Sequence, residues 1–288
     1  MSWSVVEIPL PESLSEAAVD VLHAEGANSA AEEWRGGETY VRGFWNDVPE
    51  EEAAAAASRA LQRLVDAGLL EQAPEFSVTT LEDRDWLEGW KQYFPPLEIS
   101  PKLAIVPSWE TYTPRPEQAV VTLDPGMAFG TGGHGTTSTC LQALAETLTP
   151  GMAVCDIGTG SGILSIAAVK LGAARVVAVD NDDLAIRVAR ANARLNEVAD
   201  AIDFRVGDLL AGVDGPFDLI TANILAPVIL LLVPQLARVL PAGGYAITSG
   251  YITSQEADIR SALEAAGHTV QARYESNDWV TLVSKILD

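Results

Sequence analysis

A glycine-rich turn, followed about twenty residues later by an acidic residue, constrains the fold of this chain most strongly. The turn reads V-C-D-I-G-T-G-S-G over 154–162, and the apolar run at 176–179 ends in Asp180. Glycines have no Cβ, so they allow a strand to turn sharply into a helix while its backbone approaches a ligand. An acid at the end of the next strand accepts hydrogen bonds from ribose hydroxyls. The pattern predicts a parallel sheet with an adenosine-containing cofactor across its edge.

The spacing of these glycines separates two classes of cofactor. A dinucleotide fingerprint requires G-x-G-x-x-G, but counting from Gly158 and Gly160 puts Ile163 at the sixth position. Asp156 would place a carboxylate near the phosphates of a dinucleotide, whereas it suits a cofactor that carries an ammonium group. The spacing therefore disfavours NAD. The pattern D-x-G-x-G-x-G with a distal Asp180 resembles the class I methyltransferases that use S-adenosylmethionine.

Composition and charge restrict the partners and the compartment. The formal net charge is −22, which argues against direct nucleic-acid binding and favours a basic protein partner; acidity that serves solubility alone is the alternative. No apolar run is long enough to span a membrane, and residues 1–4 lack a basic region leading into an apolar one. We expect a cytoplasmic protein without membrane association. Three scattered histidines and two cysteines outside any metal spacing predict no metal site.

Residues 1–84 have the pattern of a small α+β domain. Strands are expected at 3–10, 30–34, 39–45 and 76–81, and helices at 14–27, opened by Ser13, and at 51–70. The order βαββαβ is that of the ferredoxin-like split unit. Because this region has no phosphate loop or nucleophile constellation, we expect a recognition domain; a purely structural role is the alternative.

A linker is predicted at 85–110. Its first part, D-W-L-E-G-W-K-Q-Y over 85–93, has helix-like spacing of aromatics, and Trp86 and Trp90 share one face that would pack on a neighbouring domain. The remainder is rich in proline, including Pro101 and Pro107. Such a stretch predicts a stiff connection between two domains.

Residues 111–288 are predicted to form the cofactor domain, a seven-stranded, doubly wound, Rossmann-like α/β sheet. The last two strands have only 275–278 between them, so they form a hairpin that makes one strand antiparallel. The expected strands are 152–155, 175–179, 202–206, 217–222, 244–249, 269–274 and 279–284, and the expected helices are 163–171, 182–196, 225–240 and 254–266.

Two further stretches carry chemistry. Residues 124–137 read D-P-G-M-A-F-G-T-G-G-H-G-T-T, with more glycine than a simple connection needs. We expect this loop to wrap a ligand, with an ordinary mobile loop as the alternative. Residues 221–226 read T-A-N-I-L-A and lie at the carboxyl end of the fourth predicted strand. The carboxyl ends of such strands are where open α/β sheets bind ligands.

Together, these stretches resemble the ribosomal protein L11 methyltransferase (PrmA) family over almost the whole chain. One departure is Gly135, where the family commonly has proline or glutamate before the paired threonines. The resemblance implies S-adenosylmethionine as cofactor, S-adenosylhomocysteine as product, and ribosomal protein L11 as substrate, methylated on lysine side chains and the amino terminus. We expect a monomer. Two alternatives remain: a class I methyltransferase acting on another protein or a small amine, and a cofactor-binding module without turnover.

The resemblance also implies roles for individual residues. Asn223 would be the catalytic residue, accepting a hydrogen bond from the substrate nitrogen. Asp180 would bind the ribose, Asp208 the adenine amino group, and Thr137, at a helix start, the cofactor carboxylate. His134 is expected to support the loop or to help with proton transfer. The full set of expected cofactor contacts is Phe129, Gly130, Thr137, Asp156, Gly158, Gly160, Asp180, Asp208 and Asn223.

Overall fold

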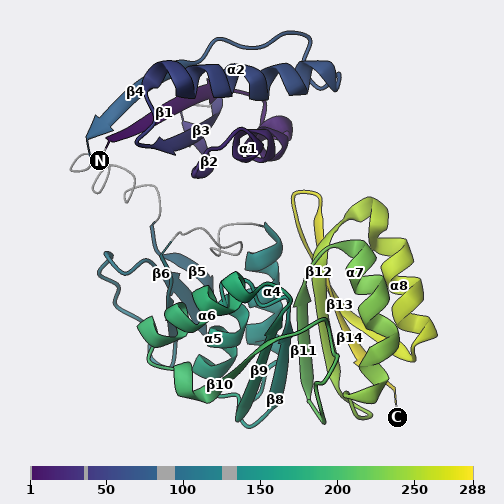
Figure 1. Cartoon of the computed structure of the whole chain (residues 1–288). Coiled ribbons are helices and arrows are strands. Elements are labelled where there is room, and N and C mark those ends of the chain that lie inside the picture. Colours follow the sequence, from purple (N-terminus) through teal and green to yellow (C-terminus); the bar gives the residue numbers. More distant parts are fainter. Residues whose placement is uncertain (1, 36–37, 83–94, 125–134, 288) are drawn as a thin grey trace. The chain divides into compact units, whose positions relative to one another are not determined.

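The computed structural model divides the chain into two compact units, Met1–Phe94 and Pro95–Asp288, and describes residues 2–35, 38–82, 95–124 and 135–287 (Figure 1). The predicted helix with Trp86 and Trp90 lies outside these ranges, as do Phe129, Gly130 and His134. Across the described ranges, no helix has the length and apolar character needed to cross a membrane.

The first unit has the predicted ferredoxin-like order. Its antiparallel sheet has the strand order β2-β3-β1-β4, and α1 and α2 pack together against it around Ile8, Val41 and Leu61. The elements are β1 (Ser2–Pro9), η1 (Glu12–Leu14), α1 (Ser15–Ala24), β2 (Ser29–Arg35), β3 (Glu38–Asn46), α2 (Glu50–Asp66) and β4 (Ser77–Glu82).

The start of α1 differs from the prediction that Ser13 opens the helix. A turn of 3-10 helix at 12–14 precedes α1, so Ser13 lies within that turn, and Leu14 at the N-cap position makes no capping hydrogen bond with its side chain. The amide of Leu14 donates to the carbonyl oxygen of Pro11 at 2.9 Å. The tighter turn thus satisfies an amide that a capping side chain would otherwise serve.

The second unit begins with a small sheet that the sequence did not predict. Its elements are β5 (Leu97–Ser100), β6 (Leu103–Val106) and β7 (Ala119–Thr122), in the order β5-β6-β7. Residues 97–106 therefore form strands of the second unit, although we expected them in a linker. Pro101 and Pro107 flank β6 rather than interrupting it, and β6 itself is buried throughout.

The main sheet confirms the doubly wound prediction (Figure 1). Its order is β10-β9-β8-β11-β12-β14-β13, and β14 alone runs in the opposite direction to the other six strands of this sheet. The strands are β8 (Ala153–Ile157), β9 (Arg175–Asp180), β10 (Ile202–Val206), β11 (Leu219–Asn223), β12 (Tyr245–Ile252), β13 (His268–Ser276) and β14 (Trp279–Ile286).

Helices cover both faces of this sheet because its inner strands are apolar on both faces. Along β8, Val154 belongs to the core beneath α4, α5 and α6, and Cys155 to the core beneath α7 and α8. The helices are α4 (Gly135–Thr147), α5 (Ile163–Lys170), α6 (Asp183–Leu195), η3 (Ala199–Ala201), α7 (Ala226–Leu232), η4 (Val233–Arg238), η5 (Thr253–Gln255) and α8 (Glu256–Ala265).

The predicted helix at 225–240 is divided into two parts. The α-helical part ends at Leu232, and residues 233–238 continue as 3-10 helix. Pro234 lies at the start of this second part. Because proline has no amide hydrogen and its ring crowds the preceding turn, it disfavours continuation of the α-helix.

Candidate active site

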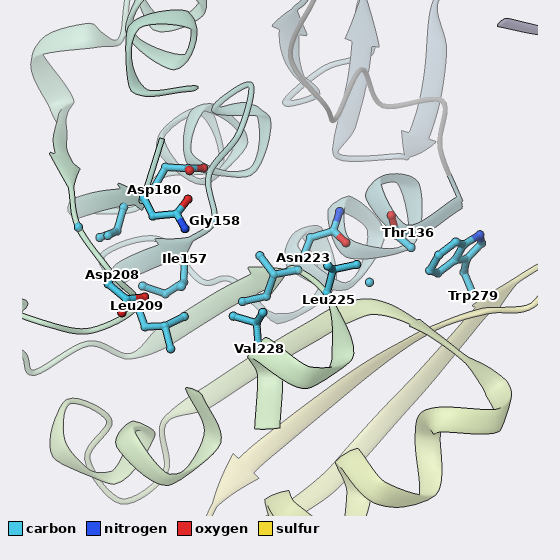
Figure 2. A pocket seen from close by; sticks show the side chains of 15 residues that line it. Thr136, Ile157, Gly158, Asp180, Asp208, Leu209, Asn223, Leu225, Val228 and Trp279 are labelled. Carbon is cyan, nitrogen blue, oxygen red and sulfur yellow. The ribbon is translucent and has the colours of Figure 1, made fainter. Parts of the chain in front are cut away.

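A cavity of about 400 Å³ opens at the carboxyl ends of the central strands (Figure 2). It lies at β8 and β11, where the strand order reverses direction, which is the usual ligand site of an open α/β sheet. Its described lining residues come from the ends of the parallel strands, the turns that follow them, α4 and β14: Thr136, Ile157, Gly158, Val179, Asp180, Asn181, Gly207, Asp208, Leu209, Asn223, Ile224, Leu225, Val228, Gly250 and Trp279.

The glycine turn after β8 is shaped by close approaches of other segments. Gly158 has a φ of +70°, and a Cβ there would lie 2.2 Å from Cγ2 of Ile224. Gly162 has a φ of +82°, and its Cβ would lie 2.9 Å from Cβ of Ala189 on α6. Both positions require glycine, because their φ angles are positive and because a Cβ would collide with a neighbouring side chain. The turn can therefore lie against the segment after β11 and form one wall of the cavity.

Asp180 at the end of β9 is held in a fixed orientation by two backbone amides. Its Oδ2 accepts from the amide of Gly160 at 2.9 Å, and its Oδ1 from the amide of Asp182 at 3.0 Å. An ionised carboxylate has about four acceptor positions. The side chain, which lines the cavity, thus keeps acceptor capacity for a pair of ligand hydroxyls.

Asp156 is completely buried behind the glycine turn and does not line the cavity. Its carboxylate accepts hydrogen bonds from the hydroxyls of Thr159, Ser165 and Thr221, each at 2.7 Å. Burial raises the pKa of Asp156, and these three donors counteract part of that effect. In this arrangement the side chain fastens the turn to α5 and β11.

Asn223 ends β11 and contacts the first turn of α4. Its Nδ2 donates to Thr137 Oγ1 across a long 3.4 Å hydrogen bond. This use of the amide nitrogen leaves Oδ1 as the acceptor that the side chain offers to the cavity. Thr137 is fully buried, and its neighbour Thr136 lines the cavity instead.

Asp208, which was predicted to bind the adenine amino group, is exposed and lies at the rim of the cavity. The adjoining Leu209 has a φ of +50°, an uncommon conformation for a residue with a side chain. Gly207 donates its amide to the carbonyl oxygen of Asp180 at 2.9 Å. The turn after β10 is thereby tied to the end of β9, next to the apolar wall formed by Ile157 and Val179.

The structure brings some of the predicted contacts together and separates others. Those that line the cavity are Gly158, Asp180, Asp208 and Asn223. Gly160 does not line the cavity, but its amide donates to the carboxylate of Asp180. Thr137 and Asp156 are buried and do not line the cavity. As ligand contacts, all of the predicted residues stay predictions.

Leu225 and Trp279 are among the lining residues that the sequence prediction did not name as contacts. Leu225, two residues after Asn223, is 69% exposed although it is apolar. Trp279 begins β14, and because β14 is antiparallel its first residue lies at the carboxyl edge of the parallel strands. The position of Trp279 could have been found from the sequence, because the predicted hairpin at 275–278 implies that the last strand starts at the ligand edge of the sheet. Figure 2 shows Trp279 near Thr136, with Asn223 and Leu225 nearby.

Comparisons with known proteins agree with this architecture. The chain matches the family model described as Ribosomal protein L11 methyltransferase (PrmA) over residues 2–286. Relatives named ribosomal protein L11 methyltransferase from Bacillus cytotoxicus and Bacillus anthracis are 38% identical over 310 residues, covering 99% of this chain and of each relative. A crystal structure of a ribosomal protein L11 methylase from Lactobacillus delbrueckii subsp. bulgaricus is 40% identical, with a TM-score of 0.63 over 68% of this chain and 100% of that one.

Proposed function

Because the chain belongs to the ribosomal protein L11 methyltransferase family, we propose that it transfers methyl groups from S-adenosylmethionine to amino groups of ribosomal protein L11. The acceptors are lysine side chains and the amino terminus. The observation that carries the proposal is a single cavity with a ribose-type acceptor, Asp180, toward one end and an amide acceptor, Asn223, toward the other (Figure 2).

The chemistry of the lining fits S-adenosylmethionine better than a dinucleotide. Asp180 offers acceptors for two ribose hydroxyls, and Ile157, Val179 and Leu209 offer apolar surface for a flat base. Among the described lining residues there is no lysine or arginine to neutralise a pyrophosphate. The two acidic side chains, Asp180 and Asp208, suit a cofactor that carries positive rather than negative charge.

In the proposed reaction, S-adenosylmethionine supplies a methyl group on a positively charged sulfur, which is a good leaving group. Asn223 Oδ1 accepts a hydrogen bond from the substrate amine, so the nitrogen lone pair is directed along the line of attack. The apolar neighbours Leu225 and Trp279 exclude water from the amine. A lysine ammonium group must first release its proton, and transfer to bulk water is sufficient for this step.

The first unit is proposed to recognise the protein substrate. Its ferredoxin-like sheet belongs to the region matched by the family, and the net charge of −22 attracts a basic protein. The same charge disfavours direct nucleic-acid contacts. We place the reaction in the cytoplasm, where ribosomal proteins are made, and propose that the chain acts as a monomer.

A label-transfer assay tests the proposal. The protein is incubated with methyl-labelled S-adenosylmethionine and separated proteins of the large ribosomal subunit, and the labelled band is identified. Label on ribosomal protein L11 supports the proposal, and label on another protein or on a small amine favours a different class I substrate. Tight cofactor binding without transfer to any fraction would identify a binding module without turnover.

A further inference from the structure

Three buried hydroxyl groups join three separate elements beside the strand end that carries Asn223. They belong to Thr139 on α4, Thr281 on β14 and Ser249 on β12, which are exposed over 6%, 0% and 0% of their surfaces. The Oγ1 atoms of Thr139 and Thr281 are 2.7 Å apart, and Thr281 donates to Ser249 Oγ at 2.8 Å. Ser249 in turn donates to the carbonyl oxygen of Val280 at 2.9 Å.

These hydrogen bonds form a chain with one direction. Each hydroxyl has a single proton to donate. Since Thr281 gives its proton to Ser249, the Thr139–Thr281 hydrogen bond requires Thr139 as its donor, and the chain then runs from α4 through β14 to β12. The carbonyl oxygens of Gly135, at 2.8 Å, and Thr136, at 3.1 Å, compete for the same Thr139 proton. A buried network in which every member has a partner holds its elements in one arrangement.

Both ends of this chain lie close in sequence or in register to residues at the acceptor end of the cavity. At the α4 end, Thr139 lies in the segment with Thr136, which lines the cavity, and Thr137, which accepts from Asn223 Nδ2. At the β12 end, Ser249 lies opposite Asn223 in the β11–β12 register. The carbonyl oxygen of Ser249 also accepts from the amide of Ile224 at 3.1 Å.

We propose that Thr281 is a positioning residue for the amine acceptor site, an inference that rests on the proposed methyl transfer. Thr281 does not line the cavity. It holds α4 and β12 at a fixed separation through Thr139 and Ser249, and this separation sets the Thr137–Asn223 pair. Without the link, Asn223 Oδ1 loses its alignment, and small misplacements of reacting groups cost large factors in rate.

Four variants test this role. Thr281→Val keeps the shape of the side chain and removes the hydroxyl; the Thr139 hydroxyl can then donate to the carbonyl oxygen of Gly135, 2.8 Å away, so it is not left without an acceptor. Thr281→Ser retains the hydroxyl. Ser284→Ala is the matched control, because it removes another fully buried hydroxyl from the same strand, one that contacts His268 Nδ1 at 3.2 Å. Thr139→Val cuts the same link from α4 if Thr281→Val does not fold.

The readouts are the steady-state constants for ribosomal protein L11, the Kd for S-adenosylmethionine, and the NMR signals of the Asn223 side-chain amide. Thr281→Val is expected to lower kcat by roughly 10- to 100-fold and to leave the cofactor Kd within about twofold. It should shift the Asn223 signals. Thr281→Ser should restore kcat and the signals, and Ser284→Ala should leave both unchanged.

An unchanged kcat with unchanged Asn223 signals in Thr281→Val would overturn the inference, and so would equal effects of Thr281→Val and Ser284→Ala. The NMR comparison separates this inference from the proposed function. If the wild-type protein does not methylate ribosomal protein L11, the proposed function fails. The Asn223 signals then still decide whether Thr281 positions that side chain.

Discussion

At the scale of single residues, two aspartates at neighbouring strand ends have different surroundings. Asp156 is surrounded by three hydroxyl donors and shielded from solvent, whereas Asp180 is oriented by backbone amides and lines the cavity. A carboxylate that already has buried side-chain partners serves the fold, and one with remaining acceptor positions can serve a ligand. We therefore propose Asp180, and not Asp156, as the cofactor contact.

Asp180→Ala should weaken binding of S-adenosylmethionine by about 1–3 kcal/mol, the usual cost of removing a charged hydrogen-bond acceptor. Calorimetric titration measures the change, and Asp183→Ala is the control. Asp183 is an exposed acid three residues further on, paired with Arg187 on the surface of α6. Equal affinities for wild type and Asp180→Ala would mean that the ribose is held by other groups. NAD should not bind to the wild-type protein.

Asn223→Ala should lower kcat for methyl transfer on the order of 100-fold, because the substrate nitrogen loses its orienting acceptor, while cofactor affinity changes much less. Asn223→Asp keeps an oxygen acceptor, so it should retain more of the rate. Steady-state kinetics and calorimetry on the same samples give both quantities. Parallel losses of rate and cofactor affinity in Asn223→Ala would show that this residue is chiefly a cofactor contact.

At the scale of elements, the glycine turn combines a left-handed backbone with a close approach. Gly158→Ala should abolish tight cofactor binding, because the new Cβ would lie 2.2 Å from Ile224 and displace the segment after Asn223. Gly212→Ala is the control, since its φ of +68° matches the +70° of Gly158 and no atom lies within 4 Å of the new Cβ. Both variants should lose about 1–2 kcal/mol of stability from the backbone conformation.

Denaturant unfolding and calorimetry distinguish these two effects of the glycine substitutions. The loss of cofactor binding should be confined to Gly158→Ala. If Gly212→Ala weakens binding as much, the contact with Ile224 is not what the turn requires. Because the two positions have nearly the same φ, a difference between the variants reports the steric effect of the new Cβ and not the cost of the backbone conformation.

The β13–β14 hairpin contains a buried histidine that should make stability depend on pH. His268 is 2% exposed, and burial lowers the pKa of its imidazole below the ordinary value of 6.5. The unfolded chain therefore binds a proton at a higher pH than the folded one. Stability is full above about pH 6.5 and falls as the pH drops toward the lower folded pKa.

His268→Gln should remove this contribution. Urea unfolding between about pH 7 and pH 5 should show a steeper loss of stability for wild type than for the variant. The difference in the free energy of unfolding between wild type and His268→Gln should therefore become smaller as the pH falls. Parallel curves would show that His268 does not titrate with the unfolding transition.

The elements around the cavity were predictable, whereas long-range side-chain contacts were not. Strands and helices of the main sheet follow from apolar runs separated by helical spacing, and the glycine turn with Asp180 marks the ligand edge. The hydroxyl of Thr221 reaches Asp156 across 65 residues of sequence, and no local pattern encodes such a pair. The strands at 97–106 were missed because flanking prolines suggested a linker, although proline is compatible with strand ends.

At the scale of the whole molecule, we propose that the first unit recognises the substrate and that the second unit binds the cofactor. A chain beginning at Pro95 keeps every described residue of the cavity, so it should bind S-adenosylmethionine as the full chain does. It should lose methylation of intact ribosomal protein L11, because the proposed recognition unit is absent. Calorimetry and label transfer check the two halves of this prediction. Full activity of the shortened chain on intact substrate would refute recognition by the first unit.

We propose that the protein transfers methyl groups from S-adenosylmethionine to amines of ribosomal protein L11 in this cavity. Mass spectrometry of purified, unmethylated L11 after incubation with the protein and the cofactor tests it directly. We predict methyl additions that map to lysine side chains and the amino terminus, and far fewer with Asn223→Ala. An unchanged mass of L11, from a protein that binds the cofactor, would contradict the claim.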